Sequence, residues 1–165
     1  MNDEERIGEL ARRLGALLAQ QGMMMAAAES CTGGWLAKAV TDVAGSSGWF
    51  DRGFVTYSNA AKQDMLGVRR ETLEEHGAVS EATVRAMAEG ALSHSLADVS
   101  VAISGIAGPG GATPTKPVGT VWMAWSRRQG ETVTRHFLFA GDREAVRAQA
   151  VMAALEGLLA MFGSA

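Results

Sequence analysis

Short apolar runs alternate with amphipathic segments along much of the chain, and this alternation restricts the fold more than any other feature of the sequence. Residues 3–21 carry apolar side chains at the spacing of one helical face, which predicts a helix. Residues 23–29, MMMAAAE, form a short apolar run that predicts a buried strand, because the helix predicted over residues 34–43 follows almost directly. Strand–helix alternation of this kind is typical of parallel βαβ units.

The later segments continue this pattern and then change it. Residues 50–58 and 98–105 predict two more strands, and a hairpin is predicted after them, with strands over residues 120–126 and 132–141. Four further helices are predicted, over residues 59–66, 69–76 and 80–96 and from Asp142 to the end of the chain. Asn59 is the predicted cap of the first of these helices, and His94 is predicted to lie in the middle of the third. We therefore predict an α/β fold, a three-layer α/β/α sandwich around a mixed, mostly parallel sheet.

Size, charge and cysteine content exclude several classes of protein. A chain of 165 residues with 47% apolar residues suits one domain over residues 1–165. A net charge of -3 argues against a dedicated nucleic-acid binder. Cys31 is the one cysteine, which suits a reducing cytoplasm, and no apolar stretch approaches the roughly 20 residues that span a bilayer. We expect a cytoplasmic protein without nucleic-acid or membrane partners, and no histidine or carboxylate spacing predicts a metal site.

The segment Glu29–Gly34, ESCTGG, lies where the first strand gives way to a helix, and it is the first candidate site. In open α/β sheets, ligands bind at the carboxyl ends of the strands. Backbone amides of Thr32, Gly33 and Gly34 near a helix N-terminus could stabilise an oxyanion, and Ser30 could be a nucleophile beside them. The alternative is that these residues only cap the helix, with Glu29 as a surface acid.

A nucleophilic serine needs a base, and a lysine is the best candidate in this sequence. The three histidines fit structural or surface positions, so no Ser-His-Asp set can be assembled. Lys62 follows the second predicted strand, and Tyr57 lies near the end of that strand. A lysine that lies beside a phenol and is partly desolvated can accept a proton, as in known Ser-Lys pairs. The alternative is a solvated lysine and a core tyrosine.

A glycine-rich loop follows the third predicted strand. Residues 104–111, SGIAGPGG, contain Ser104, Gly105 and Gly108, and their backbone could hold a phosphate or a ribose. The loop matches neither the dinucleotide fingerprint nor the P-loop, so no nucleotide cofactor is predicted. Arg143, one residue after the predicted helix cap, is a candidate partner for an anion.

Taken together, the segments 28–68, 76–81, 104–111, 116–122 and 141–147 resemble the CinA C-terminal domain family over nearly the whole chain. The resemblance implies hydrolytic deamidation of nicotinamide mononucleotide to nicotinate mononucleotide and ammonia, without cofactor or metal, by a protein that forms homo-oligomers. The additional N-terminal domain of longer family members is absent here, so we do not expect its pyrophosphatase activity.

The residues and the resemblance lead to one hypothesis for the reaction. Ser30 attacks the carboxamide and Lys62, assisted by Tyr57, moves the proton. The predicted substrate-binding residues are Glu29, Cys31, Thr32, Gly33, Gly34, Asn59, Ser104, Gly105, Gly108 and Arg143. Three alternatives stay open: Cys31 as the nucleophile, a nucleotide-binding or competence-related module without turnover, and an amidase for another carboxamide.

Overall fold

The computed structural model of the protein describes residues 1–163. Its sheet has the strand order β2-β1-β3-β4-β5. The strands are β1 (Met25–Glu29), β2 (Phe50–Val55), β3 (Val99–Gly105), β4 (Thr120–Arg127) and β5 (Thr132–Leu138). β1 pairs in parallel with β2 and β3, whereas β4 is antiparallel to both β3 and β5. Four strands therefore run in one direction and β4 opposes them, which confirms the predicted mixed sheet.

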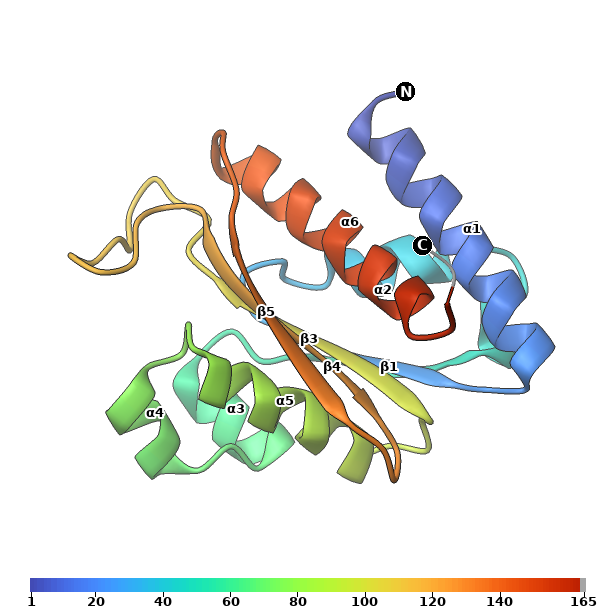
Figure 1. Ribbon diagram of the computed structural model, residues 1–165, viewed down its shortest axis with the longest axis horizontal. Helices are drawn as coiled ribbons and strands as arrows, with labels where there is room; N and C mark the ends of the chain where they lie inside the picture. Colours follow the sequence, from blue (N-terminus) through green and yellow to red (C-terminus); the bar gives the residue numbers. More distant parts are fainter. Residues whose placement is uncertain (164–165) are drawn as a thin grey trace.

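Helices cover both faces of the sheet, as Figure 1 shows. One face carries α1 (Asp3–Gln21), α2 (Trp35–Thr41) and α6 (Arg143–Ala160). The other face carries α3 (Asn59–Leu66), α4 (Arg70–His76) and α5 (Glu81–Ser93). The three-layer α/β/α sandwich is therefore confirmed, and a short 3-10 turn, Ser46–Gly48, is its one addition to the predicted order of elements.

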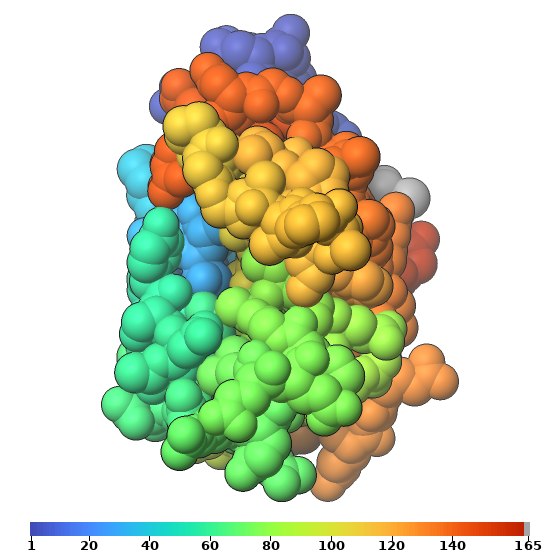
Figure 2. Space-filling view, turned by 90° about the vertical axis from the view of Figure 1, so that its left-hand side faces the viewer, coloured from blue at the N-terminus to red at the C-terminus, as the bar shows by residue number. Residues whose placement is uncertain are grey.

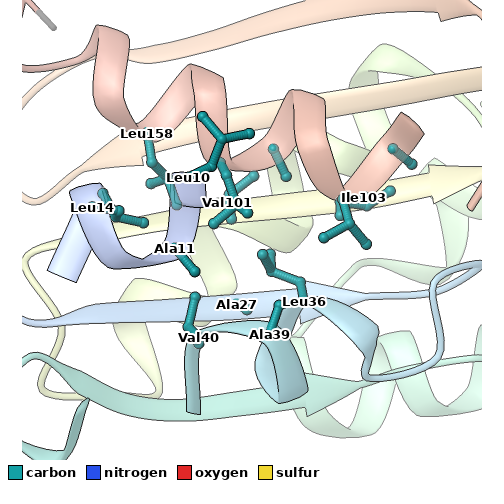
Figure 3. Packing of buried hydrophobic residues seen from close by; sticks show 14 of the residues in the cluster. Leu10, Ala11, Leu14, Ala27, Leu36, Ala39, Val40, Val101, Ile103 and Leu158 are labelled. Atoms are coloured by element: carbon teal, nitrogen blue, oxygen red, sulfur yellow. The ribbon is translucent and has the colours of Figure 1, made fainter. Parts of the chain in front are cut away.

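The sheet separates two apolar cores because successive side chains of a strand point to opposite faces. On β3, Val101 and Ile103 belong to the core under α1, α2 and α6, whereas Ala102 belongs to the core under α5. Figure 3 shows how Leu10 of α1 and Leu36 of α2 meet the β3 side chains in the first core. Burial of these side chains fixes the two helical layers to the sheet.

Two details of the helix ends differ from the prediction. Residues 56–58 leave the sheet, and the hydroxyl of Ser58 accepts a hydrogen bond from the amide of Ala61 at 3.0 Å. Ser58 is thus the cap of α3, and the prediction of Asn59 was wrong because Asn59 is already helical. His94 lies just beyond the end of α5 rather than in mid-helix, and one of its ring nitrogens lies 2.8 Å from the carbonyl oxygen of Gly90.

The carboxyl ends of β1, β2 and β3 meet at one edge of the sheet because these three strands are parallel. Figure 2 looks onto this edge. The teal segment after β2, the green segment before α5 and the yellow loop after β3 surround the blue turn that follows β1. Segments far apart in the sequence therefore meet around the residues that follow β1.

Candidate active site

A pocket of about 260 Å³ opens at this edge of the sheet. Its walls come from the segments that follow β1, β2 and β3, from the residues before α5 and from the first turn of α6. The pocket brings together eight residues that the sequence predicted for the site: Ser30, Cys31, Tyr57, Lys62, Ser104, Gly105, Gly108 and Arg143.

Ser30 and Lys62 are in direct contact at the base of this pocket. The amine nitrogen of Lys62 lies 3.0 Å from the hydroxyl oxygen of Ser30. Ser30 is held at the end of β1 because its amide donates to the carbonyl of Ile103 on the neighbouring strand at 3.0 Å. Both residues are buried, with 8% of Ser30 and 1% of Lys62 exposed. A hydroxyl and an amine thus meet out of bulk water.

The surroundings of Lys62 favour its neutral form. The amine donates to the carbonyl oxygens of Thr56 at 2.7 Å and Tyr57 at 3.3 Å, so its partners in the chain are neutral oxygens. Burial lowers the pKa of Lys62 from its usual 10.5 to about 8. A neutral amine has two N–H groups and one lone pair. In the protonated amine all three N–H groups have acceptors, namely the two carbonyls and the Ser30 hydroxyl. In the neutral amine the two carbonyls would take the N–H groups, and the lone pair would be available to the Ser30 hydroxyl.

Tyr57 contributes its backbone rather than its phenol to Lys62. Its side chain is 62% exposed, and its hydroxyl accepts a hydrogen bond from the guanidinium of Arg143 at 3.2 Å. Arg143 also donates to the carbonyl of Gly108 at 2.7 Å. The expected contact between the phenol and the amine is replaced by a bridge from the end of β2 to the start of α6. This bridge places a cation at the mouth of the pocket.

Glu29 caps α2 and is not a surface acid. Its side chain is 1% exposed and accepts hydrogen bonds from the Thr32 hydroxyl at 2.7 Å and from the amides of Leu36 at 2.9 Å and Ala37 at 3.0 Å. A carboxylate at a helix N-terminus is stabilised by the partial positive charge of that end. The protein's own carboxylate thus occupies the amides of Leu36 and Ala37 at the N-terminus of α2.

Four further predicted residues lie outside the pocket walls. Asn59 is exposed on the first turn of α3. Thr32 faces Glu29, and the amide of Gly33 donates to the carbonyl of Ser30 at 3.0 Å, so this amide is used inside the turn. Gly33 and Gly34 have φ values of 58° and 101°, which glycine adopts without strain. These residues therefore shape the turn that carries Ser30.

A larger groove of about 820 Å³ lies on the other side of this turn, between the first turns of α1, α2 and α6. Gly33 and Gly34 line this groove together with several acidic side chains. We assign the site to the smaller pocket because that pocket contains the Ser30–Lys62 contact. Within residues 1–163, no three histidine, cysteine or acidic side chains lie close enough together to hold a metal ion.

Cys31 lines the pocket but is a poor nucleophile. Burial raises the pKa of its thiol from 9.0 to about 11. Because the thiolate is the reactive form, very little of it is present near neutral pH. Ser30, with the Lys62 amine beside it, is the better candidate.

The glycine-rich loop packs closely against the rest of the molecule. A Cβ atom on Gly105 would lie 2.6 Å from a methyl group of Val121 on β4, so a larger residue cannot fit without movement. Ser104 is 1% exposed and stands at the end of β3, next to the strand that delivers Ser30. Ser104 and Ser30 both line the pocket. Gly108, with a φ value of 84°, holds Arg143 through its carbonyl.

Sequence reasoning missed several residues at this site, and those outside the glycine-rich loop come from two other segments. Ala78 and Val79, in the segment before α5, form an apolar wall of the pocket. The segment HGAVSE had indicated the family, but not this position. Arg147 contacts the turn from α6 and donates to the carbonyl oxygens of Cys31 and Thr32. Its helical spacing gave no signal, because an arginine on an amphipathic helix is usually solvated.

The fold and the site define an α/β/α domain with a buried Ser–Lys pair at the carboxyl edge of its sheet. The family model of the CinA C-terminal domain matches residues 7–162. The chain belongs to the CinA C-terminal domain family.

Comparisons with individual proteins agree with this assignment. The chain is 56% identical over 162 residues to the nicotinamide-nucleotide amidohydrolase PncC of Escherichia coli K12, which covers 98% of both chains. It is 53% identical to the protein of that name from Pseudomonas putida, over 93% of this chain and 95% of the relative. Among solved structures, the competence/damage inducible protein CihA of Agrobacterium tumefaciens superposes with a TM-score of 0.93 at 49% identity, over 95% and 96% of the two chains.

Proposed function

We propose that the protein hydrolyses the carboxamide of nicotinamide mononucleotide and releases nicotinate mononucleotide and ammonia. The observation that carries this proposal is the 3.0 Å contact between the Lys62 amine and the Ser30 hydroxyl. The relatives named as nicotinamide-nucleotide amidohydrolases support the substrate. Such a reaction recycles the pyridine nucleotide that remains when NAD is consumed.

In the first half of the reaction, the oxygen of Ser30 forms a bond to the carboxamide carbon and its proton passes to neutral Lys62. The protonated amine then gives this proton to the amide nitrogen, and the C–N bond breaks to release ammonia. An ester between Ser30 and the nicotinoyl group remains. Ser104, which lines the pocket with Ser30, is our candidate donor for the oxyanion. The amide of Gly33 is already used, because it donates to the carbonyl of Ser30.

In the second half, water attacks the ester carbon and passes its proton to Lys62. The bond between the carbon and Ser30 breaks, the proton returns to the serine oxygen, and the product leaves as the carboxylic acid. This acid then gives its remaining proton to the released ammonia, so the final products are nicotinate and ammonium. Lys62 is neutral again at the end of each cycle, and no catalytic group outside the Ser30–Lys62 pair is needed for the proton transfers.

The pocket and its mouth suit the two ends of the substrate. About 260 Å³ is at the low end of ligand pockets, so the pyridine carboxamide would occupy the interior and the ribose phosphate would extend outward. Arg143 and the glycine-rich loop stand where the phosphate would emerge. The substrate phosphate would displace the exposed hydroxyl of Tyr57 from the Arg143 guanidinium.

The test is ammonia release by purified protein from nicotinamide mononucleotide, with free nicotinamide in parallel and with and without a chelator. We expect turnover of the nucleotide alone, unaffected by the chelator, and a product one mass unit heavier. Ser30→Ala should abolish turnover while substrate affinity stays similar. Binding without ammonia release would identify a nucleotide-binding module, and release from other carboxamides alone would identify a different amidase.

We also propose that the protein is cytoplasmic and homo-oligomeric and acts without nucleic acid. The net charge of -3 and the single, buried cysteine support this setting. Within residues 1–163, no helix combines the length and apolar character that crossing a membrane requires. Light scattering on the purified protein would give the oligomeric state, and a monomer at micromolar concentration would contradict the proposal.

A further inference from the structure

Arg147 lies on the opposite side of the Ser30 turn from the base. Its Nε donates to the carbonyl oxygen of Cys31 at 3.0 Å, and its Nη2 donates to the carbonyl oxygen of Thr32 at 3.2 Å. Its guanidinium carbon lies 5.5 Å from the centre of the Trp35 ring. Arg147 is therefore attached to two successive peptide groups directly after the nucleophile.

The two side chains that contact the turn after β1, Arg147 and Lys62, come from different layers of the sandwich. Arg147 belongs to α6 on one face of the sheet, and Lys62 belongs to α3 on the other face. The turn between them contains Gly33 and Gly34, which impose little conformational restriction of their own. The bond from the Ser30 amide to Ile103 fixes the start of the turn, and Arg147 holds the two peptide groups that follow Ser30.

Arg147 also reaches the nucleophile through hydrogen bonds. The carbonyl of Thr32, which accepts from Arg147, shares its peptide unit with the amide of Gly33. That amide donates to the carbonyl of Ser30 at 3.0 Å. Hydrogen bonds in such a chain polarise and strengthen one another. The planar guanidinium suits this arrangement because it offers two donors in a fixed geometry, whereas an ammonium group is a point charge.

We propose that Arg147 is a positioning residue for the reaction, which holds the turn after β1 so that the Ser30 hydroxyl stays within hydrogen-bond distance of Lys62. This inference rests on the proposed serine chemistry. A displacement of about 1 Å at a reacting group can lower the rate by about 10²-fold. Loss of Arg147 therefore lowers kcat, while the binding residues at the mouth of the pocket stay in place.

The experiment compares Arg147→Ala and Arg147→Lys with a matched pair, Arg128→Ala and Arg128→Lys. Arg128 also donates to backbone carbonyls, those of Ala97 at 2.8 Å and Leu92 at 2.6 Å, but it lies at the β4–β5 turn, away from the pocket. Both arginines are thus anchored to carbonyls, and their loss should lower the melting temperature. Only the Arg147 variants should alter the chemistry.

We expect Arg147→Ala to lower kcat about 10²-fold with KM changed less than about 3-fold, and Arg147→Lys to lie between it and the wild type. Added guanidinium ion should restore part of the kcat of Arg147→Ala. The Arg128 variants should keep a kcat within about 2-fold of the wild type. A kcat of Arg147→Ala, or of Arg147→Lys if the alanine variant does not fold, within about 2-fold of the matched Arg128 variant would overturn the proposal.

A second readout separates this proposal from the proposed function. The rate at which a small serine-reactive organophosphorus reagent labels Ser30 measures the geometry of the Ser30–Lys62 pair without the substrate. Labelling should be slower in the Arg147 variants than in the Arg128 variants. The wild type could be labelled and yet release no ammonia from nicotinamide mononucleotide. That result would refute the proposed substrate, and the labelling rates of the Arg147 and Arg128 variants would still decide the proposal for Arg147.

Discussion

Lys62 is the residue on which the proposed chemistry depends, because a lysine can act as a base only when it is neutral. Burial lowers its pKa to about 8, and its amine contacts the Ser30 hydroxyl and the carbonyls of Thr56 and Tyr57. The same burial raises the pKa of the neighbouring Cys31 thiol to about 11. Desolvation disfavours the charged form of both groups, and this activates the amine but inactivates the thiol.

The lowered pKa of Lys62 predicts a specific pH dependence. The fraction of neutral amine rises with pH, so kcat/KM should increase about tenfold per pH unit below pH 8 and level off above it. Lys62→Arg should lower kcat/KM by about 10²–10⁴-fold, because arginine stays protonated. Steady-state kinetics from pH 6 to 10 would measure both effects.

A control variant makes this measurement specific to the buried lysine. Lys38 is exposed and paired with Asp42, so Lys38→Arg should keep the wild-type profile. A wild-type profile that is flat between pH 6 and 9 would show that the ionisation of Lys62 does not limit the reaction.

At the scale of single residues, the sequence predicted the contact between Ser30 and Lys62 but not the orientation of the Tyr57 side chain. Ser30 and Lys62 could be predicted because each follows a strand and because parallel strands end at the same edge. The direction of the Tyr57 side chain could not be predicted, since its hydroxyl is bound by Arg143, which lies 86 residues further along the chain. The contact of Arg147 with Thr32 spans 115 residues and leaves no local pattern.

At the scale of elements, the order of helices and strands followed from hydrophobic periodicity, whereas the ends depended on individual side chains. Ser80 and Asp142 were predicted to begin helices, and both cap them in the structure. The group that caps α2 was missed because it does not lie next to the helix. It is the carboxylate of Glu29, a residue of β1, which accepts hydrogen bonds from the amides of Leu36 and Ala37. Sequence rules for helix caps consider only the residues next to a helix, so they do not detect a cap that is supplied by the side chain of a strand residue.

The role of Glu29 as a cap predicts an effect on stability rather than on substrate affinity. Glu29→Gln removes the charge at the N-terminus of α2 and places an amide N–H₂ where two acceptors are needed. We expect a loss of about 1–3 kcal/mol in the free energy of unfolding, with KM changed less than about 3-fold. Denaturant unfolding and steady-state kinetics would measure the two quantities.

Glu74→Gln is the matched control for this substitution. Glu74 is exposed on α4 and forms a surface ion pair with Arg70, which should contribute at most about 1 kcal/mol. If Glu29→Gln were as stable as this control, or if its main effect were a large rise in KM, Glu29 would instead contact the substrate.

At the scale of the whole molecule, the site is assembled from three strand ends and from both helical layers. The pocket takes Ser30 from the end of β1, Lys62 from α3 on one face and Arg143 from α6 on the other. The sequence predicted the sandwich, and the sandwich predicts which edge carries the site. It did not predict that Glu29 occupies the N-terminus of α2, whereas the loop after β3 and Arg143 line the pocket.

This division of the pocket predicts that recognition of the phosphate can be separated from the chemistry. Arg143 is hydrogen-bonded to Gly108 and Tyr57 at the mouth, and among the described residues it forms no hydrogen bond with Ser30 or Lys62. Arg143→Ala should raise KM for nicotinamide mononucleotide roughly 10- to 100-fold, as expected for a lost charge-assisted bond to phosphate, with kcat changed much less. Nicotinamide riboside, which lacks the phosphate, should be hydrolysed equally well by the wild type and the variant. An equal loss with both substrates would mean that Arg143 acts on the reacting groups, and the phosphate would then have to be bound elsewhere on the glycine-rich loop.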